Sequence, residues 1–545
     1  MNAPRSVPGR WVLPAATASS LTAISCVLLG TCYNNPFVLD DKRTVEQNPE
    51  LISRPFYFLS AEPYLRHLPH SDRSRPLTFL TYSANAYFSS DPASFRATNT
   101  ALHVANCLAW EALVTSIFGE EARAIAAASA LLFLVAPLTW GTAAYVYGRA
   151  EILAALFELG ACVAIVRTEM LGSTRPSGAV QSGAWHWLTI GSAVAAVSSK
   201  QTALRLVVLL PLVLGARSRT ARQGFGTAAA WAGVLGACAL VYLVARLAVA
   251  GSVFDLEAEQ VPALGEYLAH QPAALMQYAL LLFLGPVRAG GVKLTLDHAF
   301  TAESLSPLWP LALLFTLAAV AHGRVGTFCI LWYLSAVGCT ALVPTTDALA
   351  ERRAYLGAPA LLLAACALVS SCVRNRAFRR ALLAASAAVF LAHSAARNRT
   401  FGSEEAVWTE ALDAYPHSVR ALNNLATLLS REEARAAEAR RLYERLVLRN
   451  PLDAHALSNL GILCLRSAAA ACAEPYASAM LRRAVDADTR RTLAPPRFAL
   501  ALVAERQGRA ADAAELYREA LEIDPGHTRA RRNLKLVEDT AGFSD

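Results

Sequence analysis

Long apolar runs alternate with short polar links along the first 396 residues of the chain. Runs of about 16 to 25 apolar residues are long enough, or nearly so, to cross the hydrocarbon core of a bilayer as a helix. The pattern predicts an all-α membrane domain over residues 1–396 with eleven spans, several of them short: 12–30, 98–117, 124–147, 150–168, 185–199, 201–216, 225–249, 306–321, 325–343, 355–372 and 381–396.

The charges that flank these runs predict an orientation. Basic loops at 216–222, 322–324 and 373–380 fall on the same side as the N-terminus, which the positive-inside rule assigns to the cytosol. An odd number of spans then places the loop 31–97 and the C-terminal tail together on the other side. A further apolar run, 274–287, would start and end on that side, so we expect it to lie at the interface or dip into it.

After Asn398 the pattern changes to Ala, Arg, Glu and Leu at helical spacing, and a repeat begins. Its last unit has Ala513, Tyr517, Ala520 and Pro525 at the small, aromatic, small and proline positions of the tetratricopeptide motif. Two earlier units show the same pattern at Ala439, Tyr443, Leu446 and Pro451, and at Leu460, Gly461, Ala477, Leu481 and Ala484. Three units and a final helix at about 527–540 predict a short α-solenoid over 397–545, whose concave groove would bind extended peptide.

The composition indicates a membrane protein and argues against a soluble, nucleic-acid-binding or disulfide-rich protein. Of 545 residues, 55% are hydrophobic and 17% charged, which is too apolar for a soluble chain of this size. The net charge of +8 is spread over short loops and the tail, so it indicates topology rather than nucleic-acid binding. The eleven cysteines predict neither a zinc site nor a disulfide framework. Cys464 and Cys472 could pair in an oxidising lumen, although buried thiols are the expectation.

Ionisable residues within or beside apolar runs are candidates for function, because charge at membrane depth is costly. They are Arg149, Glu151, Glu158, Lys200 and Arg205. In the expected topology the links 148–151 and 198–201 and the loop 344–354 open on the same side as the adjacent acids Asp40 and Asp41. Taken singly, each such residue has a plainer interpretation, since interfacial Arg and Lys usually snorkel to headgroups and loop acids are usually solvated.

Taken together, these residues suggest a chemistry. The expected topology gathers the acids Asp40, Asp41 and Glu151 and the cations Arg149, Lys200, Arg352 and Arg353 at one end of the bundle. A lipid-linked phosphate donor needs cations to neutralise its leaving group, and a hydroxyl acceptor needs an acid residue to remove its proton. The sequence therefore predicts a group-transfer site on the non-cytosolic side.

Seven short motifs occur in order along the chain. They are FVLDD at 37–41, SRPLTFLT at 74–81, N-x-x-x-H-x-x-N at 99–106, GRAE at 148–151, SKQ at 199–201, AERRAYL at 350–356, and RN at 397–398 followed by WTE at 408–410. Together with the repeats they resemble the TMTC family, the transmembrane and tetratricopeptide-repeat O-mannosyltransferases of the endoplasmic reticulum, in the GT-C superfamily. The likeness covers nearly the whole chain.

The resemblance implies a GT-C transmembrane bundle followed by repeats, in the endoplasmic reticulum membrane with the loop 31–97 and the repeats in the lumen. The implied activity is transfer of mannose from dolichyl-phosphate-mannose to Ser or Thr hydroxyls of secretory-pathway proteins, with inversion. The repeat domain would hold the polypeptide acceptor. No cofactor is expected with certainty, and a divalent metal stays open because an acid pair can serve as base or as ligand.

The resemblance also implies roles for individual residues. Asp40 or Asp41 would supply the catalytic base, the other orienting it. Arg75, His103 and Glu151 would shape the site, and the donor phosphate would lie beside Arg149, Lys200, Glu351 and Arg352. Two departures from the family pattern are Gln201, where an acid is usual, and a repeat array shorter than those of animal members.

Two other interpretations fit the same residues. In one, an inactive bundle anchors a tetratricopeptide adaptor in the lumen, and Gln201 favours this view. In the other, the same fold occupies a bacterial inner membrane, faces the periplasm and uses a polyprenyl-phosphate sugar. Loop charges do not distinguish these two membranes, because the charge rule is the same in both.

Overall fold

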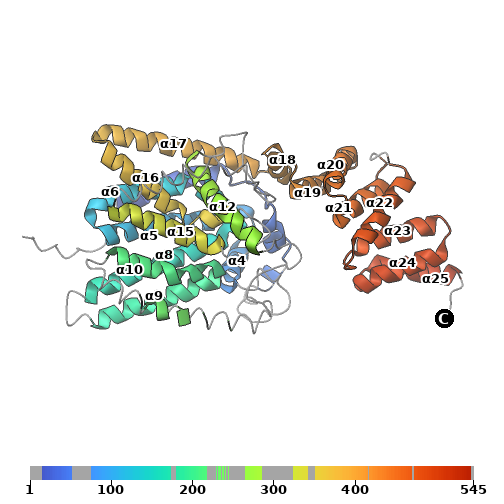
Figure 1. Cartoon of the computed structure of the whole chain (residues 1–545), viewed down its shortest axis with the longest axis horizontal. Helices are drawn as coiled ribbons and strands as arrows, with labels where there is room; N and C mark the ends of the chain where they lie inside the picture. Colours follow the sequence, from blue (N-terminus) through green and yellow to red (C-terminus); the bar gives the residue numbers. More distant parts are fainter. Residues whose placement is uncertain are drawn as a thin grey trace, which may run out of the picture. The chain divides into compact units, whose positions relative to one another are not determined.

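The computed structural model of the chain describes residues 15–48, 50–51, 54, 75–172, 179–217, 264–284, 323–341, 350–414, 416–468 and 472–541, with scattered positions between 229 and 244. Within these ranges every regular element is a helix, which confirms the all-α class. The chain divides into two compact units, Met1–Glu404 and Glu405–Asp545 (Figure 1). The division falls shortly after the expected boundary at 396 because the last long helix of the first unit continues to Thr400.

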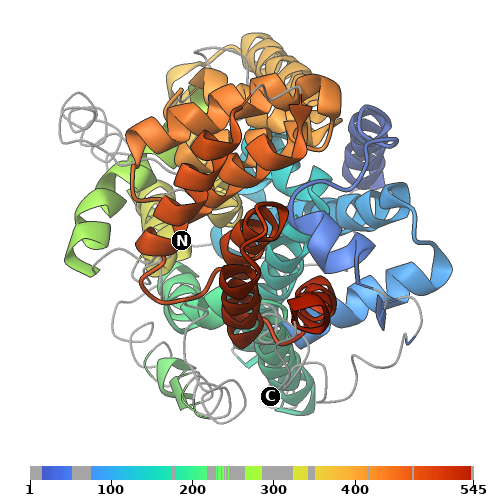
Figure 2. The same ribbon diagram turned by 90° about the vertical axis from the view of Figure 1, so that its right-hand side faces the viewer.

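Long helices build the first unit, and most of them run across Figure 1, so that they are seen end-on in Figure 2. Their buried faces meet around large apolar side chains such as Trp110, Trp140 and Trp332. The helices are α1 Ala15–Gly30, α4 Pro76–Phe88, α5 Pro92–Phe118, α6 Arg123–Val135, α7 Pro137–Ala144, α8 Arg149–Gly172, α9 Ala179–Ser199, α10 Leu206–Arg217, α12 Leu264–Leu284, α15 Gly323–Ala341, α16 Ala358–Cys372 and α17 Arg376–Thr400.

Short helical turns connect them: η1 Lys42–Glu46, η4 Glu120–Ala122, η5 Val146–Gly148, η7 Gln201–Arg205 and η8 Glu351–Ala354. Three of these turns touch a motif: η5 ends at the first residue of GRAE, η7 begins at the last residue of SKQ, and η8 lies within AERRAYL. The three motifs therefore lie at or beside short turns next to the ends of long helices. α4 lies inside the segment 31–97, which the sequence had led us to expect as a loop.

One predicted helix, 124–147, is wrong as a single element. Its two halves, α6 and α7, are bent by 54°. Ala136 has extended backbone angles, φ −64° and ψ 133°, and Pro137 starts the next helix. Proline disfavours a helical conformation in the preceding residue and has no N–H to continue the helix, so the chain turns there.

The eleven predicted spans are not confirmed. Among the described residues, α5 alone is long and apolar enough to cross a membrane, and the bent α6–α7 pair would be a second span if it counts as one. Shorter apolar helices lie at Thr17–Gly30, Gly323–Cys339 and Ala358–Cys372. The runs 225–249 and 306–321 lie largely or wholly outside the described residues, and α12 covers most of the run expected at the interface.

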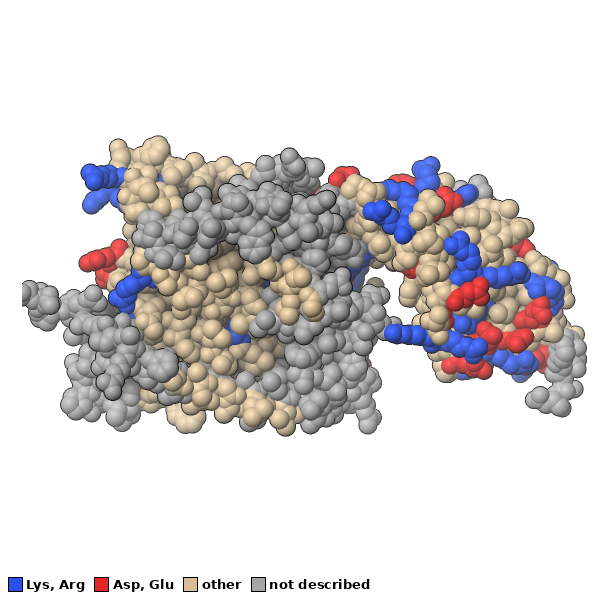
Figure 3. All heavy atoms as spheres, viewed as in Figure 1, with Lys and Arg blue, Asp and Glu red and all other residues tan. Residues whose placement is uncertain are grey.

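Charge is distributed differently over the two units. The described face of the first unit in Figure 3 carries few charged side chains, whereas the second unit carries many of both signs. Exposed apolar residues such as Trp187, Val194 and Val208 lie on α9 and α10. An apolar outer surface of this kind is typical of helices that face lipid.

Asn398 joins three parts of the first unit near the end of α17. Its side-chain amide donates to Thr31 Oγ1 at 2.5 Å and to the Leu28 carbonyl at 3.3 Å, and its Oδ1 accepts from Trp140 Nε1 at 3.1 Å. Its carbonyl accepts a further bond from Asn35 Nδ2 at 2.6 Å. α1, α7 and α17 are thereby fixed together just before the acids at 40 and 41.

The second unit consists of helical hairpins. α18 Glu404–Ala414 leads into it, and the hairpins are α19 Val419–Leu429 with α20 Ala436–Arg449, α21 Ala454–Arg466 with α22 Glu474–Ala487, and α23 Ala494–Arg506 with α24 Ala510–Ile523, followed by α25 Thr528–Ala541. Ala513, Tyr517 and Ala520 are fully buried, as the repeat motif predicts. A Cβ at Gly461 would lie 2.6 Å from Leu481 Cγ, so the small residue lets α21 and α22 pack closely.

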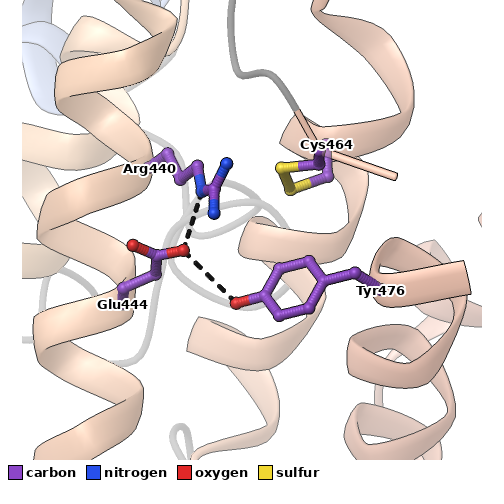
Figure 4. The surroundings of a disulfide bond; sticks show 5 residues. Arg440, Glu444, Cys464 and Tyr476 are labelled. Atoms are coloured by element: carbon purple, nitrogen blue, oxygen red, sulfur yellow. Dashed lines mark hydrogen bonds and ion pairs between the residues drawn. A yellow bond between two sulfur atoms is a disulfide. The ribbon is translucent and has the colours of Figure 1, made fainter. Parts of the chain in front are cut away.

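A disulfide joins Cys464 to Cys472, and the expectation of two buried thiols is therefore wrong. The sequence spacing did not show that α21 ends at Arg466 or that the two Cα atoms lie 5.2 Å apart, which is close enough for a disulfide. Close to the disulfide, Glu444 accepts bonds from Arg440 Nε at 2.7 Å and from the Tyr476 hydroxyl at 3.4 Å (Figure 4).

Candidate functional site

The acids Asp40 and Asp41 form the first helical residues after α1 and lead directly into η1. We call residues 39–42 the acidic turn. Leu39 has φ 54°, in the left-handed region that non-glycine residues rarely adopt. Just before the turn, the Arg96 guanidinium donates to the Asn35 carbonyl and, at 2.5 Å, to the Pro36 carbonyl. Strained backbone that the surrounding structure holds in place is a feature of functional sites.

Asp41 is completely buried. Its Oδ1 accepts the backbone N–H of Tyr147 at 2.8 Å, while its Oδ2 is buried with no hydrogen-bond partner among the described residues. Burial raises the pKa of Asp41 from 3.8 to about 7, although the Tyr147 N–H and the charge of Arg96 oppose this shift. A carboxyl group with a pKa near the working pH suits proton transfer.

Asp40 is held by Tyr145, two residues from the backbone group that holds Asp41. The Tyr145 hydroxyl donates to Asp40 Oδ2 at 3.0 Å and accepts the Asp40 backbone N–H at 3.2 Å. The segment 145–147 between α7 and α8 therefore fixes both acids. Sequence reasoning missed Tyr145 and Tyr147; their position directly before the GRAE motif was the available signal.

Gly148 lets this segment turn. A Cβ at residue 148 would overlap the backbone carbonyl of Thr142, so any other residue would displace one of the two backbones. The backbone approaches itself here more closely than a side chain allows, which is a positional reason for glycine.

Four charged side chains form a buried ion-pair network across α8, η7 and the residue before it. Lys200 Nζ lies 2.5 Å from Glu151 Oε1. Arg205 makes two bonds to Glu158, Nε to Oε1 at 2.8 Å and Nη2 to Oε2 at 2.9 Å, and its Nη2 lies 4.0 Å from Glu151 Oε2. The network (Glu151, Glu158, Lys200 and Arg205) thus contains equal numbers of acids and cations, as burial requires.

Two arginines add positive charge where the network meets the acidic turn. The charges of Arg75 and Arg352 both act on Lys200, and that of Arg352 acts on Tyr145 as well. Arg75 also donates to the Tyr147 hydroxyl at 2.8 Å and lies over its ring. The structure therefore brings Asp40, Asp41, Arg75, Glu151, Lys200 and Arg352 into one neighbourhood. The three cations of this neighbourhood, Arg75, Lys200 and Arg352, favour binding of an anion.

Three other predicted site residues make different contacts. Arg149 is buried and donates to Asn99 Oδ1 at 2.7 Å and Asn85 Oδ1 at 2.9 Å, which ties α8 to α4 and α5. His103 is buried between Tyr355 Oη, 2.6 Å from Nδ1, and the Leu134 carbonyl, 3.2 Å from Nε2. Glu351 forms an ion pair with Arg397 of α17. These contacts connect helices beneath the acidic turn and the cations.

The described residues contain no group of three or more His, Cys, Asp and Glu side chains placed to hold a metal ion. The candidate site thus consists of two acids with different surroundings and a neighbouring cluster of cations. This arrangement can remove a proton from one reactant and neutralise an anionic leaving group on another.

Comparison with known proteins supports the resemblance seen in the motifs. The tetratricopeptide repeat family matches residues 495–527. Protein O-mannosyl-transferase TMTC1 of Mus musculus is 28% identical over 181 residues, which cover 30% of this chain and 18% of that protein. The Homo sapiens TMTC1 is 29% identical over 166 residues, and the Homo sapiens TMTC4 is 28% identical over 229. The chain is related to the TMTC family.

The similarity to TMTC proteins is partial. Matched residues cover 28% of this chain and 18% of Homo sapiens TMTC1, and 36% of this chain and 29% of TMTC4. The chain thus spans less than a third of the length of these TMTC relatives. Two crystal structures of MamA align with 26% of the chain, and with 72% and 77% of their own chains, at 23% identity and TM-scores of 0.22 and 0.23, which are too low to support an argument.

Proposed function

We propose that this TMTC relative is a multi-pass GT-C membrane glycosyltransferase that transfers mannose from dolichyl-phosphate-mannose to Ser or Thr hydroxyls of secretory-pathway proteins, with inversion. The observation that carries the proposal is the pairing of Asp40 and Asp41 on one fixed turn beside the cations Arg75, Lys200 and Arg352. The name of these relatives, protein O-mannosyl-transferase, supports this choice of reaction.

In the proposed reaction an aspartate takes the proton of the acceptor hydroxyl. The hydroxyl oxygen forms a bond to the anomeric carbon while the bond from that carbon to the phosphate oxygen breaks, and the electron pair leaves with dolichyl phosphate. Attack on the face opposite the leaving group inverts the configuration at the anomeric carbon. Arg75, Lys200 and Arg352 neutralise the negative charge that develops on the phosphate.

Asp41 is the proposed base and Asp40 the residue that orients the acceptor. Asp41 Oδ2 makes no hydrogen bond among the described residues, so its lone pairs are free for an acceptor hydroxyl that enters the site, and the raised pKa of Asp41 suits this role. Asp40 Oδ2 is already engaged by the Tyr145 hydroxyl. Glu151 holds the Lys200 ammonium in place, while Arg149, His103 and Glu351 fix the helices around the site.

The repeat unit is proposed to hold the polypeptide acceptor in the lumen of the endoplasmic reticulum. Tetratricopeptide arrays generally bind peptides in their concave groove. The Cys464–Cys472 disulfide supports an oxidising compartment, because cytosolic thiols are kept reduced.

The test is a transfer assay with the full-length protein in detergent, radiolabelled dolichyl-phosphate-mannose and a Ser/Thr-rich peptide library. The wild type is compared with Asp40→Asn and Asp41→Asn, and we expect transfer from the wild type and its loss in Asp41→Asn. Equal transfer in all three proteins would contradict the proposed base. A folded wild type that transfers mannose only when polyprenyl-phosphate-mannose replaces the dolichyl donor would identify the bacterial type of donor. A folded wild type that transfers mannose from neither donor would favour the adaptor.

A further inference from the structure

Glu404 contacts the acidic turn on both sides of the aspartate pair. Its Oε1 accepts the backbone N–H of Leu39 at 3.0 Å, and its Oε2 pairs with Lys42 Nζ at 2.9 Å. Leu39 precedes Asp40 and Lys42 follows Asp41, so one carboxylate spans the four residues of the acidic turn. The Glu404 side chain is 17% exposed, which makes these contacts stronger than those of a solvated surface ion pair.

The two contacts of Glu404 stabilise the backbone of Leu39 and hold the Lys42 ammonium in place. Leu39 holds a left-handed backbone conformation that disfavours residues with a Cβ, and the bond to its N–H helps to keep it there. The Lys42 ammonium, without Glu404, would be available to either neighbouring aspartate. A cation beside a carboxylate lowers its basicity, so pairing Lys42 with Glu404 preserves the capacity of the turn to accept a proton.

Glu404 also occupies a special place in the chain. It is the last residue of the first unit and the first residue of α18. The next residue, Glu405, pairs with Arg435 at 2.7 Å within the second unit. Two adjacent acids at the start of one helix thus contact different parts of the protein, Glu404 the acidic turn and Glu405 the repeats.

We propose that Glu404 is a positioning residue for the proposed transfer reaction, because it holds the backbone of the acidic turn at Leu39 and keeps Lys42 away from the aspartate pair. This inference rests on the proposed function, because it assigns Glu404 a role in the reaction of Asp40 and Asp41. Glu404 lies outside all seven sequence motifs.

The experiment compares Glu404→Ala and Glu404→Gln with the matched control Glu405→Ala in the full-length protein. We expect Glu404→Ala to lower kcat for mannose transfer about tenfold to a hundredfold, with the KM for the lipid donor unchanged, because a misplaced base slows the chemical step without weakening donor binding. Glu404→Gln keeps an oxygen that can accept the Leu39 N–H, so it should recover part of the lost kcat. Glu405→Ala should behave as wild type.

Hydrogen exchange provides a readout that does not depend on activity. Peptides covering residues 37–47 should exchange faster in Glu404→Ala than in wild type, and Glu405→Ala should leave them unchanged. If wild type transfers no mannose, the proposed reaction fails, and the assigned role of Glu404 in it fails too; faster exchange would then show only that the contact holds the turn. If wild type is active and Glu404→Ala matches Glu405→Ala in kcat, the inference is overturned, whatever the exchange rates show.

Discussion

Two adjacent aspartates acquire different properties because their surroundings differ. Asp41 is buried and accepts a hydrogen bond from the Tyr147 backbone N–H, whereas Asp40 is partly exposed and accepts one from the Tyr145 hydroxyl. Burial without a full set of hydrogen bonds favours the neutral form of a carboxyl group. Chemistry at this scale therefore depends on individual atoms rather than on the presence of an acid pair.

The pH dependence of transfer tests the role of Asp41. The rate is expected to rise with pH through about 7, because the pKa of Asp41 is raised to about 7 and only the ionised form accepts a proton. Initial rates of mannose transfer, measured below and above pH 7, show this rise. Asp41→Asn should lower the rate about 100-fold or more. If the rate of wild type already rises far below pH 7, and the same rise remains in Asp40→Asn, Asp41 is not the base.

The same pKa shift predicts the sign of a stability change. Between pH 3.8 and about 7 the folded chain keeps a proton on Asp41 that the unfolded chain releases. The stability that this group contributes is fully present below pH 3.8 and is lost as pH rises through about 7. Thermal unfolding in detergent should show this decline in wild type, and Asp41→Asn should flatten it; an equal decline in both proteins would assign the effect to other groups.

Gly148→Ala is expected to destabilise the protein and lower transfer. The new Cβ would overlap the Thr142 carbonyl, and moving either backbone would displace the Tyr147 N–H from Asp41. Overpacking of this kind costs roughly 1 to 3 kcal/mol. Gly160→Ala, whose Cβ would meet Ser192 Oγ at an ordinary 3.7 Å, is the control and should be neutral or stabilising in thermal unfolding. Equal unfolding temperatures for both variants would count against the close approach.

At the scale of elements, breaks between helices carry the site. The short turns η5, η7 and η8 each separate longer helices at or beside a motif. The buried ion-pair network joins η7 to α8, and Arg205 of the network also contacts α15. Arg205, from η7, pairs with Glu158 of α8 and donates to the Ala336 carbonyl of α15 at 2.8 Å. The network therefore fixes α8, which carries Glu151, against η7, which Lys200 precedes.

Breaking this network on one side is expected to be costlier than removing both partners. Glu158→Gln removes the closer counter-ion of the buried Arg205 guanidinium, leaves only the 4.0 Å contact with Glu151, and should cost roughly 3 to 5 kcal/mol. Combining Glu158→Leu with Arg205→Met removes both charges and should recover much of that loss. A double-mutant cycle of unfolding free energies measures the coupling, and additive effects would show that the two residues act independently.

At the scale of the whole molecule, the disulfide and the charge pattern bear on compartment and orientation. The repeat unit contains a disulfide, and the basic segment 373–380 stands at the start of α17. The proposed topology puts these two features on opposite sides of a membrane. A chain that crosses the membrane in this way would expose each to different reagents.

In sealed microsomes, a tag after Asp545 should resist added protease, whereas a tag inserted in the segment 373–380 should be cleaved. Detergent should make both accessible, which controls for intrinsic resistance. Cleavage of the C-terminal tag in intact vesicles would reverse the proposed orientation.

The disulfide makes a separate prediction for the repeat unit. Cys464→Ser should lower its stability by about 2 to 4 kcal/mol, because the cross-link restricts the unfolded chain. Alkylation of cellular protein under non-reducing conditions should leave Cys464 and Cys472 unmodified. Full modification of both thiols without reductant would indicate a reducing compartment.

Several features were predictable because they depend on local pattern. Helical periodicity and the spacing of Ala513, Tyr517 and Ala520 located the last repeat, since each repeat buries the same positions against its neighbours. Apolar runs located most described helices, although Pro137 divided one of them. The order of motifs identified the acid pair and its cations as candidates.

Tertiary structure alone decided which groups meet. The partners of the acid pair, Tyr145 and Tyr147, stand about a hundred residues away, and Glu404 more than three hundred. No local pattern encodes such contacts, because they depend on how separate helices pack. The sequence by itself determined the helical class, the repeats and the candidate acids, since these follow from periodicity and residue type. The packed fold decided burial, and burial raises the pKa of one of the two aspartates, Asp41, to about 7.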